Sequence, residues 1–219
     1  DRGLIRYLMR HRHTTPFEMV EFKFHCKMPI FVARQWVRHR TANINEYSLR
    51  YSEARDEFYM PDPEHIQFQS ALNKQGRKGE VPEELKQKVL DYFKEISERS
   101  FDIYSELNEA GVARELARSI LPVNLYTEWY WKNDLHNLLH FVGLRSDSHA
   151  QYEIRVFSDA MAESVKAVAP FAWEAYQDYV VKGMRFSRIE QSLLEKNLPH
   201  RVVDDIAEDI AYQLTATLH

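Results

Sequence analysis

Residues 20–28 alternate between apolar and polar side chains, and this pattern narrows the possible folds more than any other feature of the chain. A period of two is the spacing of a β-strand that has one face in the core and one face in water. The chain therefore needs a sheet with a covered face. The apolar positions are Val20, Phe22, Phe24, Cys26 and Met28, and the polar ones are Glu21, Lys23, His25 and Lys27.

Apolar residues at helical spacing predict helices on both sides of this strand. Pro29 suits the first turn of a helix, and Asp134 is a good N-cap residue. Gly111 is suited to ending a helix. The first predicted helix ends near Arg12, and the next ones cover residues 30–37, about 85 to Gly111, 112–120 and 134–144. Another helix begins near residue 149, and the C-terminal third, including 206–218, is predicted to be helical throughout.

The remaining segments read as strands, turns and a loop. Residues 57–60 and 125–131 are β-prone, and the polar, glycine-containing residues 73–80 predict a flexible loop. Thr15 and Glu18 have the spacing of a capping box, so taken alone they favour a turn before the strand. No repeat or linker divides the chain, and we expect a single domain over residues 1–219.

Composition excludes several classes of protein. A chain of 219 residues with 44% hydrophobic content can bury a full core, and its net charge of -4 argues against a general nucleic-acid binder. A single cysteine, Cys26, fits a reducing compartment, so we expect a cytoplasmic protein without a membrane span or signal peptide. Residues 1–13 already read as helix, which suggests a further N-terminal segment upstream.

No glycine-rich phosphate loop is present in the sequence, so side chains must hold any nucleotide.

Residues 38–50, RHRTANINEYSLR, form the most informative polar segment. Its three arginines alternate with short polar residues instead of acidic partners at helical spacing, which weakens the alternative of a solvated charged face. Guanidinium groups can bind phosphate through two parallel hydrogen bonds, and Ser48 adds a neutral donor. Gln35 and Arg38 are three apart and are predicted to share a helix face that addresses one ligand.

The sequence leaves two other functions open. His136 and His140 are four apart on one predicted helix, a spacing that can bind zinc, with Asp147 and His149 as further candidate ligands. A zinc-dependent hydrolase using His136, His140 and His149 is therefore one alternative, although no H-E-x-x-H motif is present. The other is a nucleic-acid-binding module in which Tyr47 and Tyr51 stack on bases, and the acidic net charge makes it the weaker one.

The Arg-His-Arg tripeptide, followed after seven residues by Ser48 and Arg50, resembles the signature of the flavin-dependent thymidylate synthases. Residues 13–18, the segment from Arg114 to Tyr126 and residues 134–151 are similar to further motifs of that family, in the same order. Asn43 stands where the family usually has serine. The resemblance implies an α+β fold with a central, mostly antiparallel sheet covered by helices and a helical C-terminal part. It also implies a homotetramer whose active sites are shared between subunits.

The resemblance further implies reductive methylation of dUMP to dTMP, with methylenetetrahydrofolate as carbon donor and FAD, reduced by NADPH, as hydride carrier. It implies no metal and no nucleic-acid partner. Arg145 would be catalytic by stabilising negative charge on the uracil ring, with Asp147 as a candidate for holding it in place. Arg118 would hold the nucleotide, its alternative being a surface ion pair with Glu115. The implied FAD contacts are Thr15, Arg38, His39, Arg40, Glu46, Asp134, His136 and His140, and the implied substrate contacts are His13, Gln35, Arg38, Glu46, Tyr47, Ser48, Arg50, Arg118 and Arg145.

Overall fold

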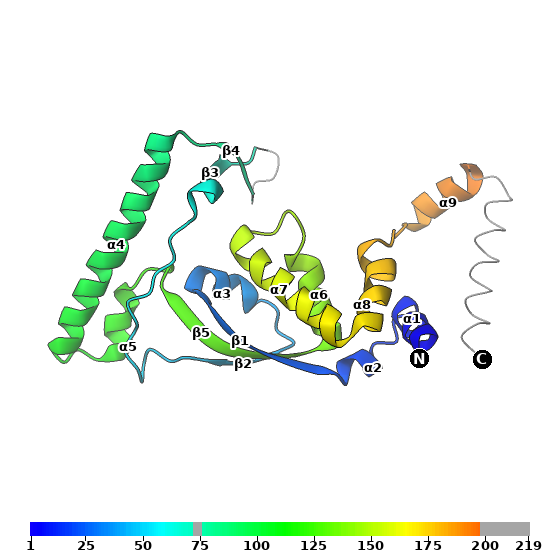
Figure 1. The fold of residues 1–219 in the computed structure, drawn as a ribbon, viewed down its shortest axis with the longest axis horizontal. Helices are drawn as coiled ribbons and strands as arrows, with labels where there is room; N and C mark the ends of the chain where they lie inside the picture. Colours follow the sequence, from blue (N-terminus) through cyan, green and yellow to red (C-terminus); the bar gives the residue numbers. More distant parts are fainter. Residues whose placement is uncertain (72–75, 198–219) are drawn as a thin grey trace. The chain divides into compact units, whose positions relative to one another are not determined.

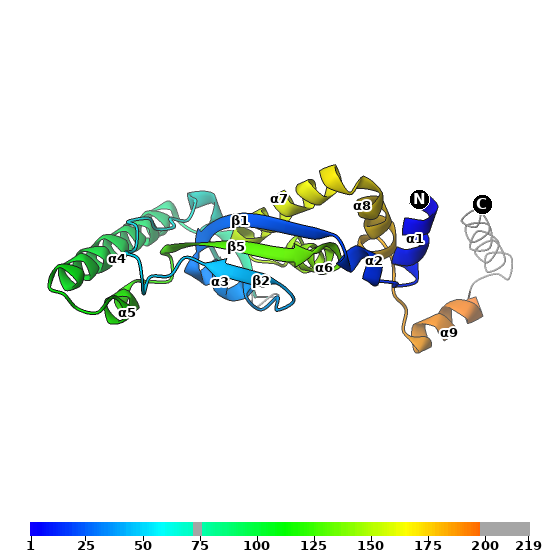
Figure 2. The same ribbon diagram turned by 90° about the horizontal axis from the view of Figure 1, so that it is seen from below.

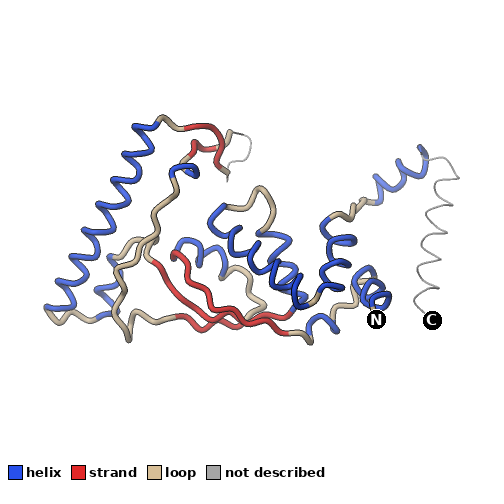
Figure 3. Tube along the Cα trace, in the orientation of Figure 1, coloured by secondary structure: helices blue, strands red, loops and turns tan. Residues whose placement is uncertain are grey.

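The computed structural model describes residues 1–71 and 76–197, and the chain divides into two compact units. We call Val20–Asp159 the sheet unit, and Asp1–Met19 together with the described residues from Ala160 onward the terminal unit. The chain contains both helices and antiparallel strands, and the described part after β5 is helical, as Figures 1 and 3 show. The predicted α+β class is confirmed. Within the part of the chain described, none of the helices has the length and apolar character needed to cross a membrane.

The sheet unit is built on a three-stranded antiparallel sheet in the order β1-β5-β2. These strands are β1 (Glu21–Pro29), β5 (Tyr126–Asp134) and β2 (Asn43–Glu46), and Trp131 of the central strand is aligned with both Phe24 and Ile44. The predicted alternation is confirmed, because Cys26 and Met28 are buried while Lys23, His25 and Lys27 are exposed.

Helices cover one face of this sheet. Figures 1 and 2 show α3 (Ile30–Trp36), α6 (Leu135–Arg145) and the start of α7 (Tyr152–Val168) on the same side of β1 and β5. The indole of Trp36, fully buried, lies with its ring centroid 4.9 to 5.5 Å from those of Phe141, Trp131 and Trp129. Aromatic groups of this size contribute much of the stability of a core, so this cluster fixes α3 and α6 on the sheet.

A second core lies under the long helix α4 (Glu83–Glu109), next to α5 (Arg114–Ala117) and the short helix η2 (Arg118–Ile120). Buried Tyr104 of α4 packs with Ala54, Ala117 and Leu125, and its hydroxyl accepts a hydrogen bond from the backbone N–H of Ala54 at 2.8 Å. The helix ends where predicted, because Gly111 adopts a left-handed conformation with φ of +80° that favours glycine.

The prediction of a loop over residues 73–80 is wrong for its second half. Arg77–Glu80 forms β4, which pairs with β3 (Gln67–Gln69). The short helix η1 (Pro63–His65) precedes β3 in the chain, and residues 72–75 lie outside the described part. An exposed two-stranded hairpin needs no apolar alternation, so the polar sequence gave no strand signal. The strand predicted over 57–60 is reduced to one bridge, between Phe58 and Leu125.

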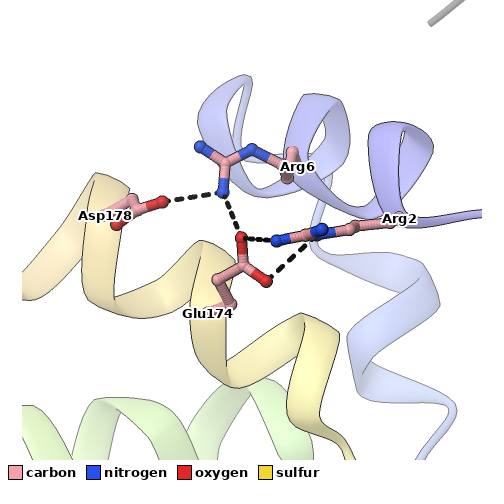
Figure 4. Close-up of polar contacts among 4 residues, drawn as sticks. All are labelled: Arg2, Arg6, Glu174 and Asp178. Carbon is pink, nitrogen blue, oxygen red and sulfur yellow. Dashed lines mark hydrogen bonds and ion pairs between the residues drawn. The ribbon is translucent and has the colours of Figure 1, made fainter.

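The terminal unit is helical. It contains α1 (Arg2–Arg10), α2 (Thr15–Glu18), α8 (Pro170–Tyr176), the π-helical turn η3 (Gln177–Val181) and α9 (Arg188–Asn197), while the helix predicted over 206–218 lies outside the described residues. Two arginines of α1 pair with acids of α8 and η3: Arg2 binds Glu174 at 2.6 Å, and Arg6 bridges Glu174 and Asp178 (Figure 4). The capping box predicted from Thr15 and Glu18 does not form, because Thr14 occupies the N-cap position and makes no side-chain cap bond.

Candidate active site

The Arg38–Arg50 signature lies beside helix α6, about 100 residues further along the chain. The guanidinium of Arg145 donates from Nε to Nε2 of His39 at 3.0 Å. Thr41 donates from Oγ1 to Oδ1 of Asn137 at 2.9 Å. Because Asn137 and Arg145 stand near opposite ends of α6, the signature contacts this helix over most of its length. We call His39, Thr41, Asn137, His140 and Arg145 the α6 cluster.

Local sequence explains how α6 presents these groups. Asp134 caps the helix as predicted, accepting the backbone N–H of Asn137 at 2.8 Å through Oδ1 and its side-chain amide at 2.7 Å through Oδ2. Leu138 and Phe141 are fully buried and hold the helix on the sheet. Arg145 is the last helical residue, where a cation interacts favourably with the helix dipole.

Burial sets the electrostatics of the α6 cluster. The pKa of His39 is lowered to about 4, first by burial and then by electrostatic interaction with Arg145 and His140. Burial also lowers the pKa of Arg145, although a guanidinium keeps its proton in proteins. The His39 ring contacts Phe141 edge-on at 4.8 Å between centroids, and exposed His140 lies at 6.3 Å. A neutral imidazole thus meets a charged guanidinium.

Two predicted contacts of this region are corrected. Asp147 does not hold Arg145, because its Oδ1 accepts both the backbone N–H and the Nδ1 side of His149, each at 2.8 Å; these bonds lower the pKa of Asp147. Gln35 and Arg38 do not share a helix face, since α3 ends at Trp36, whose buried indole anchors the last turn.

Gln35 instead donates from its side-chain amide to Oε1 of Gln151. This contact joins the end of α3 to the segment that follows Arg145. Gln151 was missed as a candidate, although it ends the Leu-Arg-x-Asp-x-His-Ala-Gln run by which this region resembles the family. That run was the only available signal, because nothing in local spacing relates residues 116 positions apart.

A second polar cluster, which includes the predicted Arg50, lies where α5 meets the end of the signature. Arg50 pairs with Glu115 at 3.1 Å. Arg114 binds the carboxylate of Glu53 at 2.9 Å and the carbonyl of Tyr51 at 3.2 Å. We call Arg50, Tyr51, Glu53, Arg114 and Glu115 the α5 cluster. Glu115 therefore pairs with Arg50, and the surface pair considered for Arg118 does not form.

Strand β2 and the turn after it join the two clusters along the chain. Glu46 ends β2 and accepts the Thr127 hydroxyl at 2.7 Å. Tyr47 donates its hydroxyl to the carbonyl of Glu53 at 2.9 Å. The Oγ of Ser48 accepts the backbone N–H of Arg50 at 3.4 Å, so this hydroxyl sits within a turn. No general base contacts it in the described structure, which fits the binding role expected for Ser48.

Three of the predicted ligand-binding arginines have no ion-pair partner in the part of the chain that the structure describes. Among the described residues, no side-chain hydrogen bond or salt bridge holds Arg38, Arg40 or Arg118; Arg38 and Arg40 are exposed, and Arg118 is half-buried in η2. Such guanidinium groups are free to take up anionic oxygen atoms of a ligand.

His13 and Thr15 belong to the terminal unit and are described within it. Both are exposed; the His13 ring lies 6.0 Å from that of Tyr7, and Thr15 is the first residue of α2. Their predicted contact with a cofactor stays a prediction.

The zinc alternative finds no ligand set among the described residues. Over residues 1–71 and 76–197, no three His, Cys, Asp or Glu side chains are grouped so as to hold a metal ion. His149, with Asp147 as its partner, is an exposed loop residue, while His136 is half-buried on α6.

Comparison with known proteins assigns these motifs to one family. Residues 1–171 match the Thy1 family, described as thymidylate synthase complementing protein. The chain is 54% identical over 201 residues to the flavin-dependent thymidylate synthase of Rickettsia conorii, covering 86% of this chain and 68% of that protein. It is 51% identical over 199 residues to the enzyme of the same name from Dictyostelium discoideum, covering 91% of this chain and 65% of that protein.

A solved structure shows the same fold. The crystal structure of a UMP/dUMP methylase, PolB from Streptomyces cacaoi, bound with 5-Br UMP, superposes with a TM-score of 0.77 at 36% sequence identity. The match covers 81% of this chain and 82% of that one. A second crystal structure of the same methylase, bound with 5-Br dUMP, gives a TM-score of 0.72. None of these comparisons favours a hydrolase or a nucleic-acid-binding module.

Proposed function

The chain belongs to the flavin-dependent thymidylate synthase family, and we propose that it methylates dUMP to dTMP with methylenetetrahydrofolate as carbon donor and NADPH as the reductant of bound FAD. The family and the structural likeness to a dUMP methylase establish the class of reaction. The observation that carries the assignment of residues is the contact between His39 and Arg145, because it joins two family motifs that are remote in sequence.

The residues present suit a flavin dinucleotide. A pyrophosphate needs cationic donors, and Arg38 and Arg40 are guanidinium groups without acidic partners in the described part of the chain. His136 and His140 on α6 supply polar ring edges, and Glu46 can accept hydrogen bonds. With Thr15 and Asp134 they would hold FAD. When bound, the flavin supplies the hydride that turns the transferred methylene carbon into a methyl group.

We assign activation of the nucleotide to Arg145. Its Nε is bonded to His39, which leaves the two terminal nitrogens of the guanidinium to face a ligand. Against the N3 and O4 edge of uracil, this cation would stabilise negative charge and make C5 more nucleophilic toward the methylene carbon. Half-burial strengthens the effect, because the surrounding medium screens charge less than water does.

The phosphate of dUMP would be bound by the end of the signature and by η2. Arg118 has no acidic partner among the described residues, and the Arg50 guanidinium reaches Glu115 with only one nitrogen at 3.1 Å. Ser48 and Tyr47 add hydroxyl groups on the same turn, and Gln35 and His13 complete the proposed substrate contacts. A guanidinium binds phosphate through two parallel hydrogen bonds, so these arginines are suited to the task.

We propose that the active protein is a cytoplasmic homotetramer with shared active sites. Large apolar side chains are exposed in the α5 cluster and in the chain after Glu115, with exposed fractions of 78% for Tyr51, 64% for Leu116 and 54% for Val123. Exposed apolar patches of this kind mark interfaces, so a partner subunit would cover them and complete the nucleotide site. The cytoplasmic location is supported by the free thiol of Cys26.

Substituting Arg145 tests the assignment directly. We expect Arg145→Ala to retain bound flavin and to lose dTMP formation by about 100-fold or more, the loss typical when a donor to a developing anion is removed. Arg99→Ala, which removes an exposed arginine from α4, is the matched control and should leave the rate unchanged. Full dTMP formation by Arg145→Ala would remove this residue from the catalytic role. A flavin-loaded wild-type protein that makes no dTMP would refute the function itself.

A further inference from the structure

His39 is the central residue of the Arg-His-Arg tripeptide, yet its side chain is committed to α6. Its Nε2 accepts the Nε–H of Arg145 at 3.0 Å, and its ring rests edge-on against buried Phe141. His39 is half-buried, and this bond to Arg145 is its one side-chain hydrogen bond among the described residues. The imidazole therefore fixes the direction of the guanidinium.

The geometry also fixes the protonation state of this histidine. An Nε2 that accepts a hydrogen bond carries no proton, so the ring must be the neutral tautomer with its proton on Nδ1. The groups that face it from α6 are Arg145, His140 and Phe141, and its chain neighbours are Arg38 and Arg40. Every ionisable group among these is basic, and no carboxylate contacts the ring in the described structure. This cationic environment opposes protonation of His39, in line with its lowered pKa.

Because the hydrogen-bond partner of Arg145 is a neutral imidazole, it does not neutralise the guanidinium charge as a carboxylate would. An Asp or Glu paired with an arginine orients the guanidinium and also compensates its charge. Here the nearby carboxylate, Asp147, is occupied by His149. The guanidinium of Arg145 is thus held in direction while its full positive charge stays available to the ligand, in a half-buried site where charge acts strongly.

We propose that His39 is a positioning residue that aims the Arg145 guanidinium at the nucleotide without compensating its charge. The inference rests on the proposed function, because it assigns Arg145 to the uracil ring. The new element is a requirement on the hydrogen-bond acceptor beside Arg145: this acceptor has to be uncharged.

Three substitutions separate orientation from charge. His39→Phe keeps the ring contact with Phe141 but removes the acceptor, so kcat should fall by about 10-fold to 100-fold with little change in KM for dUMP, as expected for a misplaced catalytic group. His39→Asn offers a neutral acceptor and should recover part of that loss. His39→Glu offers a charged acceptor that pairs with Arg145, so it should recover no activity. The resemblance implies that His39 also contacts FAD, but its ring is turned to Arg145 and Phe141. Bound flavin, measured by visible absorbance, should therefore stay near the wild-type level in all three variants.

The outcomes show separately whether the positioning role of His39 fails and whether the proposed thymidylate synthase function fails. If His39→Glu restores kcat as well as His39→Asn does, the need for an uncharged partner is refuted. If His39→Phe keeps wild-type kcat while Arg145→Ala is inactive, Arg145 acts without His39 and only the proposal fails. If all three variants lose flavin, His39 serves the cofactor instead. A wild-type protein without thymidylate synthase activity would refute the proposed function.

A spectroscopic measurement tests the same point without activity. Nitrogen NMR of the histidine-labelled protein, with the His39 signal assigned by its absence in His39→Asn, should show at neutral pH a neutral ring protonated on Nδ1. The Arg145→Ala variant should shift that signal, because the bonded Nε2 loses its donor. A doubly protonated ring, or a signal unchanged in Arg145→Ala, would overturn the assignment.

Discussion

Glu153 at the start of α7 is a carboxylate almost without solvent contact, and two donors satisfy it. Its residue is 5% exposed, and it accepts hydrogen bonds from the Tyr59 hydroxyl at 2.7 Å and from the Arg77 guanidinium. Burial alone would raise the pKa of Glu153, but the bonds from Arg77 and Tyr59 outweigh it, so the pKa is lowered. Burial of the Tyr59 hydroxyl and its hydrogen bond to Glu153 raise the pKa of Tyr59. The contact with Arg77 also ties strand β4 to α7.

Removing this cation should destabilise the protein in a pH-dependent way. At neutral pH we expect Arg77→Met to lower the free energy of unfolding by about 2 to 4 kcal/mol, because it leaves a buried carboxylate without a counterion. A carboxylate whose pKa is lowered on folding contributes stability above its unfolded pKa and loses that contribution as pH falls through its folded pKa. The deficit of the variant should therefore shrink below the ordinary glutamate value of 4.5.

Urea unfolding at a series of pH values measures this deficit. Lys94→Met removes one partner of an exposed pair, Lys94 with Glu98 at 3.8 Å, and should change stability by less than about 0.5 kcal/mol at every pH. A deficit for Arg77→Met that is as small as the control's, or that grows on acidification, would mean that the buried pair does not stabilise the fold.

Residue roles were predictable where a short motif carries the chemistry. Asp134 was predicted as the N-cap of α6, and this is confirmed, whereas Arg145 lies one residue beyond the helix end predicted at Leu144. The catalytic role of Arg145 stays a prediction. The partners Thr41 and Asn137, and Gln151 with Gln35, were not predicted. Local spacing shows which residues share an element, but which loops meet across the fold depends on packing of the whole unit.

At the scale of elements, α6 depends on its N-cap. We expect Asp134→Ala to lower the free energy of unfolding by about 1 kcal/mol, because two donors of Asn137 lose their acceptor. Asp134→Asn keeps a capping oxygen and should lose only a few tenths of that value. Urea unfolding compares the two, and flavin content measured in parallel shows whether Asp134 also contacts the cofactor. Equal stability of Asp134→Ala and wild type would show that the cap contributes nothing.

Elements were predictable to the extent that apolar residues repeat along them. Strand β1, the stop of α4 at Gly111 and the start of α6 follow the sequence pattern closely. The polar strand β4 carries no such repeat, because its pairing with β3 uses backbone groups in an exposed hairpin. Helix α3 ends at Trp36, one residue before the predicted end, and Val37 is its C-cap.

At the scale of the whole molecule, the sheet unit contains the family's signature and the catalytic candidate, while His13 and Thr15 lie in the terminal unit. The single-domain organisation and the tetramer remain predictions. A monomeric chain leaves Leu116, Ile120 and Val123 exposed beside the nucleotide candidates, with exposed fractions from 40% to 64%. An apolar surface at this place is expected if a second subunit packs there.

Charge on this surface should disrupt the assembly. We expect light scattering after size exclusion to give a tetramer mass for the wild-type protein and a smaller species for Leu116→Glu, because a carboxylate would be buried without a partner. Ile189→Glu, at an exposed position of α9, is the control and should leave the mass unchanged. A wild-type monomer with full activity would contradict the shared site. A tetramer that tolerates Leu116→Glu would place the interface elsewhere.

The most direct test of the central claim is a single turnover with the flavin-loaded protein, reduced chemically in the absence of oxygen. Adding dUMP together with methylenetetrahydrofolate should restore the absorbance of oxidised flavin and yield dTMP in an amount equal to the flavin reoxidised. Omitting either substrate should prevent both changes. Reoxidation without dTMP, or dTMP formed by protein that carries no flavin, would contradict the account.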